Sequence, residues 1–142
     1  MRVRKATAEW KGDLLKGTGT VATENGAVNG RYSFVSRFEE GEGTNPEELL
    51  GAAEAACFSM ALANNLAKAG FTPESVHTQA VVHLEKVDGA QTITRIILET
   101  DARVPDVDEA AFSEQVEATR TGCPISRVII HGTEVQVNAR LV

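Results

Sequence analysis

The sequence lacks the features that mark several common classes of protein. It has no excess of positive charge, since its formal net charge is −6, and it has no basic stripe, which argues against a nucleic-acid partner. No stretch approaches the roughly 20 apolar residues of a membrane-spanning helix. The first residues carry arginines and lysines but no apolar run, so no secretory signal is predicted. We therefore expect a cytoplasmic protein with no membrane partner.

Motifs for cofactors and metals are also lacking. The glycines of residues 17–20 (GTGT) stand in a strand pattern with no helix after them, so they do not form a phosphate-binding loop. The spacings of Cys57, Cys123, His77, His83 and His131 match no zinc pattern. Each of the three histidines is expected at the surface. We expect no metal and no cofactor. No repeat or linker interrupts the sequence, so a single domain spanning residues 1–142 is predicted.

The first third of the sequence predicts a three-stranded antiparallel meander. The Asn25-Gly26 pair is a strong hairpin signal, because both residues accept positive φ. A second turn is expected at residues 11–13. The three strands are then expected at residues 2–10, 14–23 and 28–37.

The central segment predicts a long helix over residues 46–68. Its start carries an asparagine suited to the N-cap, a proline suited to the first helical position and two glutamates that favour the positive dipole end (residues 45–48). Gly70 is expected to stop it. Between residues 49 and 66 the only charged residue is Glu54. A helix so apolar on all sides should be buried.

The remaining sequence alternates between strand and helix patterns. Asp88-Gly89 is a second hairpin signal, and Pro124 favours a short helical turn. The expected elements are strands at 74–87 and 91–104, a helix at 106–121, a helical turn at 124–130, and a strand at 133–141 with Val135, Val137, Ala139 and Leu141 on one face. The order βββ-α-ββ-α-β is an α+β fold with mostly antiparallel sheets around the buried helix. One copy offers little cover for that helix, so we expect an intimate homodimer.

The two cysteines are the most informative residues for function. Disulfides are rare in the cytoplasm, and those that form there are usually catalytic or sensing. Cys57 lies in the middle of the long helix, and Cys123 lies at the end of the second helix, between a glycine and a proline. On composition alone, two cysteines that only fill space in the core remain an equal alternative.

Several motifs resemble the OsmC/Ohr family of hydroperoxide-reducing proteins. The most specific is GTNPEELLGAAEAACFSMAL at residues 43–62, preceded by Arg37-Phe38-Glu39. GCPIS at residues 122–126 resembles the family's second cysteine motif. WKGD at 10–13, GTGT at 17–20 and GFTP at 70–73 fit the OsmC branch better than the Ohr branch.

The resemblance implies the fold, the assembly and the activity. Family members are intertwined homodimers that reduce organic hydroperoxides, and hydrogen peroxide less efficiently, in defence against oxidative and osmotic stress. By position in the motifs, the first cysteine is Cys57, the second is Cys123, the arginine is Arg37 and the glutamate is Glu47. Glu48 remains an alternative to Glu47 if the register differs by one residue. The reductant is implied to be a dithiol, often a lipoyl group.

The chemistry of these residues agrees with such roles. A thiol attacks peroxide as the thiolate. An apolar helix disfavours the thiolate, and a fixed cation such as Arg37 would favour it again. Glu47 is expected to hold Arg37 through a bidentate pair. In one straight helix Glu47 and Cys57 lie about 15 Å apart along the axis. Either Arg37 spans the gap, or the helix breaks, or the site draws groups from both subunits, and we expect the last or a combination. For Glu54 we expect a partner cation or exposure to solvent.

Two other functions fit the same residues. The cysteines of a non-catalytic redox sensor or binding protein on this fold would report oxidation without turnover. In a purely structural dimer they would be inert. The sequence favours the enzyme but does not exclude the other two.

Overall fold

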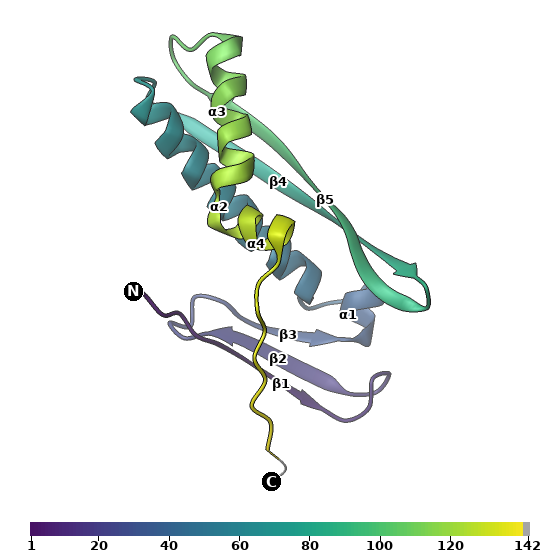
Figure 1. The fold of residues 1–142 in the computed structure, drawn as a ribbon. Helices are drawn as coiled ribbons and strands as arrows, with labels where there is room; N and C mark the ends of the chain where they lie inside the picture. Colours follow the sequence, from purple (N-terminus) through teal and green to yellow (C-terminus); the bar gives the residue numbers. More distant parts are fainter. Residues whose placement is uncertain (141–142) are drawn as a thin grey trace. The chain divides into compact units, whose positions relative to one another are not determined.

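The computed structural model describes residues 1–140, and the chain divides into two compact units. The first unit comprises residues 1–50 and 84–92, and the second comprises residues 51–83 and the chain from residue 93 onward. Helices and antiparallel strands are combined in one α+β chain (Figure 1), which confirms the predicted fold class. Within residues 1–140 we find no helix with the length and apolar character needed to cross a membrane.

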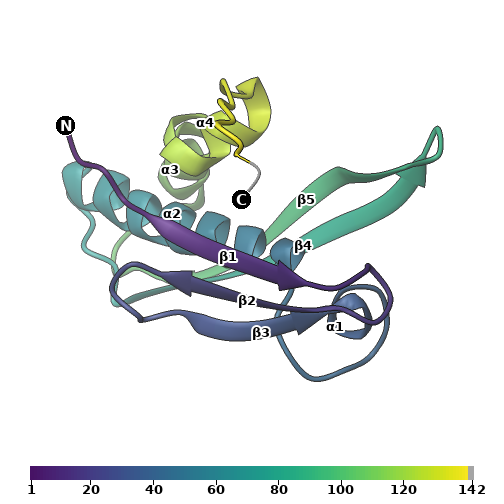
Figure 2. The same ribbon diagram turned by 90° about the horizontal axis from the view of Figure 1, so that it is seen from below.

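The first unit contains the predicted meander. Strands β1 (Ala6–Lys11), β2 (Thr18–Thr23) and β3 (Asn29–Ser33) pair antiparallel in that order (Figure 2). Trp10 and Tyr32 both lie opposite Gly19 in register, and their ring centroids are 5.3 Å apart. A β-carbon at Gly19 would collide with the Tyr32 ring. The close packing of the two rings over β2 therefore requires glycine at this position.

A short helix, α1 (Phe34–Phe38), replaces the end of the predicted third strand. Its N-cap is Ser33, whose hydroxyl accepts a hydrogen bond from the Ser36 backbone N–H, while the Ser36 hydroxyl accepts one from the Ser33 N–H. This reciprocal capping box satisfies two backbone donors that a new helix leaves free. The prediction of a strand through residue 37 is therefore wrong, and Arg37 lies on a helix.

Helix α2 (Pro46–Lys68) has the predicted limits. The side chain of Asn45 accepts a hydrogen bond of 2.8 Å from the backbone N–H of Glu48, as the N-cap role requires. Gly70 follows the helix with φ of +96°, in the left-handed region that glycine adopts without strain. The helix is continuous, so the alternative of a break between Glu47 and Cys57 is ruled out.

The hairpin and the remaining helices follow α2. Strands β4 (Ser75–Val87) and β5 (Ala90–Arg103) are joined at Asp88-Gly89, where both residues have positive φ as the hairpin signal predicted. Helix α3 (Glu109–Gly122) starts after Asp108, whose carboxylate caps the Ala111 N–H. Helix α4 (Pro124–His131) corresponds to the expected helical turn and is eight residues long.

The core of the second unit is built on one face of α2. Phe58, Leu62 and Leu66 are buried there, at the helical spacing of four residues. Half-buried side chains from β4, β5, α3 and the loop before α3 pack against them: Val76, Leu98, Val104, Val107, Phe112 and Val116. Burial of each of the three α2 side chains contributes about 1.5–3 kcal/mol.

The opposite face of α2 is open in the single chain. Ala52, Ala53 and Ala56 are exposed, and Met60 is 76% exposed. The sequence predicts burial on all sides, and the single chain provides it on one side only. The open face is apolar, so it is a surface that a further element or subunit would cover.

The predicted C-terminal strand is absent from the described part of the chain. Residues 133–140 have no regular secondary structure, and Val135 and Val137 are about four-fifths exposed, at 79% and 80%. A strand needs a neighbouring strand to complete its backbone hydrogen bonds, and this segment has none in residues 1–140. Leu141, the last residue of the expected apolar face, lies outside the described residues.

Candidate active site

The two cysteines form a disulfide in the second unit. Cys57 lies in the middle of α2, and Cys123 lies between α3 and α4, with the Cα atoms 6.3 Å apart. Cys123 is 1% exposed, whereas Cys57 is half-buried. The two cysteines that the sequence singles out for function are therefore in direct contact. The more exposed of the two residues is the one predicted to meet the peroxide.

The position of Cys123 follows from the sequence around it. Its backbone N–H donates to Thr119 O and so caps α3, and its φ and ψ of −59° and 129° are extended. Pro124 follows as the first residue of α4, and a proline disfavours helical geometry in the residue before it. Cys123 is therefore the only non-helical residue between the two helices.

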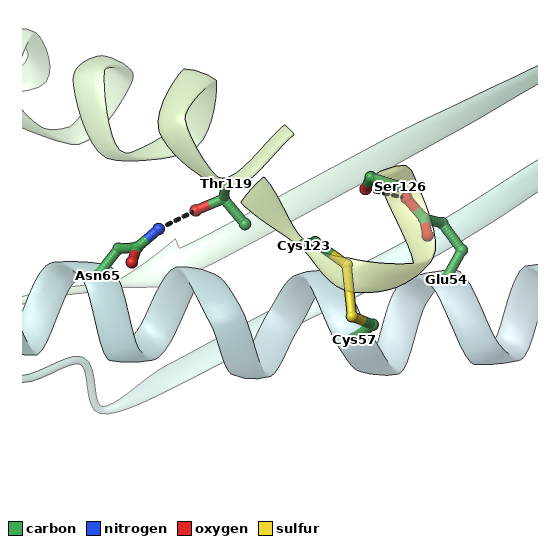
Figure 3. Close-up of a disulfide and its surroundings, with 6 residues drawn as sticks. All are labelled: Glu54, Cys57, Asn65, Thr119, Cys123 and Ser126. Carbon is green, nitrogen blue, oxygen red and sulfur yellow. Dashed lines mark hydrogen bonds between the residues drawn. A yellow bond between two sulfur atoms is a disulfide. The ribbon is translucent and has the colours of Figure 1, made fainter. Parts of the chain in front are cut away.

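Two hydrogen bonds flank the disulfide, and each joins α2 to one of the two helices beside Cys123 (Figure 3). On one side the Ser126 hydroxyl of α4 donates to Glu54 Oε1 of α2. On the other side Asn65 Nδ2 of α2 donates to Thr119 Oγ1 of α3 over 2.9 Å. Glu54 and Ser126 are each 4% exposed. The expectation that Glu54 meets a cation or solvent is therefore wrong, because it is buried against a hydroxyl group.

A cavity of about 310 Å³ borders Glu54 and Ser126. Its walls are mostly apolar, from α2, β5, α3 and α4: Phe58, Ile96, Leu98, Val116, Ile129 and Ile130. Arg120 also lines it, but its guanidinium bonds Glu117 on α3 at 2.7 Å and lowers the pKa of that exposed carboxyl. The cation that lines this cavity is thus paired with Glu117.

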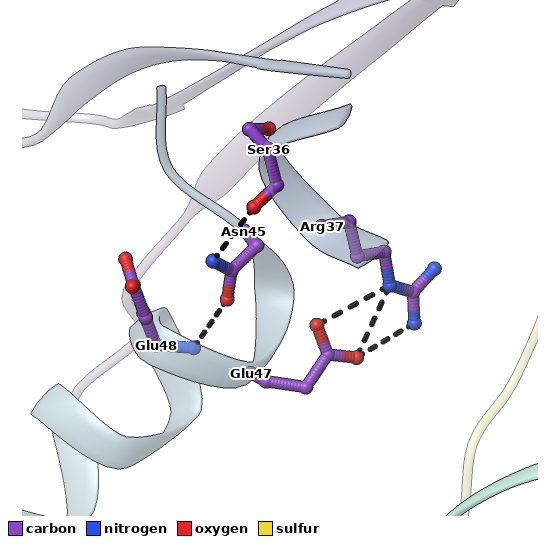
Figure 4. Close-up of polar contacts among 5 residues, drawn as sticks. All are labelled: Ser36, Arg37, Asn45, Glu47 and Glu48. Carbon is purple, nitrogen blue, oxygen red and sulfur yellow. Dashed lines mark hydrogen bonds and ion pairs between the residues drawn. The ribbon is translucent and has the colours of Figure 1, made fainter. Parts of the chain in front are cut away.

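Arg37 and Glu47 form the predicted pair in the first unit (Figure 4). Arg37 Nη2 donates to Glu47 Oε1 at 2.7 Å, and Nε donates to both carboxylate oxygens at 3.2 Å. The Glu47 side chain is 12% exposed and the Arg37 side chain 34%. The alternative residue Glu48 is not the partner, since it is exposed and all three guanidinium bonds of Arg37 go to Glu47.

The segment between α1 and α2 is fixed around this pair. Ser36 Oγ donates to Thr44 O at 2.8 Å, and Asn45 Nδ2 donates to Ser36 O at 3.1 Å. Asn45 thus caps α2 through its oxygen and ties α1 through its nitrogen (Figure 4). The arginine and the glutamate are held on two adjoining helix ends, which restricts the rotamers of both.

The structure therefore brings the predicted residues together as two pairs, one in each unit. Cys57 and Cys123 are joined in the second, and Arg37 and Glu47 are joined in the first. Sequence reasoning missed Ser126, whose link to Glu54 joins residues 72 positions apart and leaves no local signal. Across residues 1–140, no three histidine, cysteine, aspartate or glutamate side chains cluster as metal ligands would.

Comparison with known proteins gives consistent matches. A family model described as OsmC-like protein matches residues 39–138. "Peroxiredoxin OsmC" of Escherichia coli is 50% identical over 127 residues, which is 89% of each chain. An uncharacterized Bacillus subtilis protein, YmaD, is 30% identical over 93% of this chain and 89% of its own.

Solved structures share the fold at lower identity. An organic hydroperoxide resistance protein from Elizabethkingia anophelis matches with a TM-score of 0.71 at 22% identity, over 92% of this chain and 90% of its own. An OsmC-like protein of unknown function from Vibrio cholerae also has a TM-score of 0.71, at 19% identity, over 89% of this chain and 93% of its own. At these identities the likeness extends to the fold alone.

Proposed function

We propose, because the chain belongs to the OsmC-like family, that it is a thiol-dependent peroxidase that reduces organic hydroperoxides to alcohols, and hydrogen peroxide less efficiently. The observation that carries this proposal is the Cys57–Cys123 disulfide, which joins a half-buried Cys57 to a buried Cys123. The E. coli relative, which is named a peroxiredoxin and is 50% identical, supports it.

The first step oxidises Cys57. Its thiolate attacks one oxygen of the hydroperoxide, a sulfur–oxygen bond forms, and the oxygen–oxygen bond breaks. The alkoxide leaves, takes up a proton and becomes the alcohol, while Cys57 becomes a sulfenic acid. Arg37, held by Glu47, stabilises the thiolate and the developing alkoxide. In the assembled enzyme the site draws groups from both subunits.

The second and third steps restore the thiols. Cys123 attacks the sulfenic sulfur, the disulfide forms, and water leaves. A dithiol then reduces the disulfide by exchange and is itself oxidised to a disulfide. We propose a lipoyl group as the source of that dithiol. No resident cofactor or metal takes part in these steps.

The functional unit we propose is a cytoplasmic homodimer of one domain per chain, which serves in oxidative and osmotic stress. The open α2 face supports the dimer, since Ala52, Ala53, Ala56 and Met60 form an exposed apolar stripe in the single chain. Small residues let a second backbone approach closely. The unpaired segment 133–140 is a second surface available to a partner.

Met60→Glu is expected to convert the dimer to monomer, or to raise the dissociation constant of the dimer by at least about tenfold. The reason is that a carboxylate would be buried against an apolar surface. Sedimentation equilibrium over a range of protein concentrations measures this. Glu109→Gln, a charge change on an exposed residue of α3, is the control and should leave the equilibrium unchanged. A wild-type chain that sediments as a monomer at all concentrations would contradict the proposed dimer.

The function is tested by turnover of the purified protein. With tert-butyl hydroperoxide and dihydrolipoamide we expect sustained loss of peroxide well beyond one equivalent, and a slower rate with hydrogen peroxide. Consumption of one equivalent followed by arrest with all the dithiols tried would favour the redox sensor instead. Absence of any thiol oxidation would leave two structural cysteines.

A further inference from the structure

Helix α4 is held to α2 by two links that differ in kind. One is the disulfide through Cys123, and the other is the hydrogen bond from Ser126 to Glu54. Glu54 precedes Cys57 by three residues on α2, and Ser126 follows Cys123 by three residues on α4 (Figure 3). Residues three apart in a helix lie on nearly the same face. The hydrogen bond therefore joins α4 to the face of α2 that carries Cys57, about one helical turn from the disulfide.

The packing beneath α4 is incomplete. Ser126 is the one buried residue of α4, while Val128, Ile129 and Ile130 are 46%, 40% and 49% exposed. Ile129 and Ile130 also border the cavity of about 310 Å³ that separates them from β5 and α3. Apolar contacts in the single chain thus contribute little to fixing α4, which increases the importance of the two links.

We infer that Glu54 and Ser126 are positioning residues that keep Cys123 within reach of Cys57 while the disulfide is open. The inference rests on the proposed peroxidase function and adds to it a residue pair that acts on the resolving step. During turnover the covalent link is absent in the thiol and sulfenic states, and the Ser126–Glu54 hydrogen bond then remains to hold α4 against α2.

The burial of this pair supports a specific role over a solvated contact. Both side chains are 4% exposed, and Glu54 Oε2 is buried with no hydrogen-bond partner among the described residues. A carboxyl group is costly to bury with one oxygen unpartnered, and an apolar residue would fit the rest of this helix without that cost. The same burial makes the remaining Ser126 hydrogen bond strong, because water does not compete for it.

The affected step is an intramolecular competition. Cys123 attacks the Cys57 sulfenic sulfur, the sulfur–sulfur bond forms, and the sulfur–oxygen bond breaks. Hydroxide leaves with the proton of the Cys123 thiol as water, and no further oxidant or reductant is needed. If α4 separates from α2, a second peroxide oxidises the sulfenic acid to sulfinic acid instead. Holding α4 in place therefore favours the reversible product.

The test measures the lifetime of the Cys57 sulfenic acid. The reduced protein is mixed with one equivalent of tert-butyl hydroperoxide, trapped at intervals with dimedone, and analysed by intact mass. Ser126→Ala and Glu54→Met remove the hydrogen bond and are expected to lengthen the lifetime about tenfold. At excess peroxide both should accumulate sulfinic acid at Cys57. Glu54→Gln keeps an acceptor for Ser126 and should stay within about threefold of wild type.

Thr119→Val is the matched control. It removes the Asn65–Thr119 hydrogen bond, which also reaches α2 but joins it to α3, the helix that precedes Cys123. Its sulfenic lifetime should equal that of wild type, even if its melting temperature falls. Should Glu54→Met fail to fold, Ser126→Ala, which loses one oxygen atom, carries the test.

The outcomes separate the inference from the function on which it rests. Sulfenic acid that forms in both variants at the wild-type rate and with the wild-type lifetime would overturn the inference and leave the peroxidase intact. The same holds if Glu54→Gln is as slow as Ser126→Ala, since the hydrogen bond would then not be the cause. If the wild-type protein forms no sulfenic acid, the peroxidase proposal itself fails.

Discussion

Cys57→Ser is expected to abolish turnover of organic hydroperoxides, with a loss on the order of 10⁴-fold or more, down to the background rate of the free dithiol. A serine hydroxyl stays protonated at neutral pH, so no nucleophile remains where the peroxide arrives. Cys123 cannot replace it, because its sulfur is buried with 1% of the residue exposed. Peroxide consumption with dihydrolipoamide as reductant is the measurement.

Cys123→Ser is the matched comparison for this prediction. It should leave the first oxidation of Cys57 at the wild-type rate, because in the proposed mechanism Cys123 acts only after the sulfenic acid has formed. The product should be a sulfenic acid in place of the disulfide. If Cys123→Ser blocked the first oxidation and Cys57→Ser did not, the two assigned roles would be exchanged.

The elements predicted correctly are those with local signals. Asn45 and Pro46 mark the start of α2 and Gly70 lies just past its end, and these signals act within one helical turn. The Asp88-Gly89 turn likewise requires only two residues with positive φ. The disulfide joins residues 66 positions apart, and the Arg37–Glu47 pair joins two helices across ten positions. Both pairs were predicted through the family motifs rather than through local chemistry.

The errors occur where local signals compete or where partners are distant. Residues 28–37 have a strand pattern, but the serines at positions 33 and 36 form a capping box and start α1. Residues 133–140 alternate as a strand does, yet no strand within residues 1–140 pairs with them. The Glu54–Ser126 contact depends on how α4 turns after Cys123, which no local pattern specifies.

Arg37→Met is expected to slow the oxidation of Cys57 by about 100-fold, because the thiolate and the departing alkoxide lose the guanidinium cation that stabilises their negative charge. Loss of the cation also disfavours the thiolate, so the rate should recover in part as the pH is raised. Glu47→Gln weakens the bidentate pair that fixes the guanidinium and should cost about tenfold. Single-turnover loss of thiol with tert-butyl hydroperoxide, followed across pH, measures both.

Arg120→Met is the matched control for the loss of an arginine. Arg120 and Glu117 form the same bidentate pattern on α3, but their side chains are 57% and 64% exposed and the pair spans one helical turn. An exposed pair of this kind contributes little to stability, and its loss should leave the rate unchanged. An Arg37→Met protein that oxidises at the wild-type rate with an unchanged pH profile would remove Arg37 from the mechanism. Equal losses in Arg37→Met and Arg120→Met would indicate a general effect of net charge instead of a directed contact at Cys57.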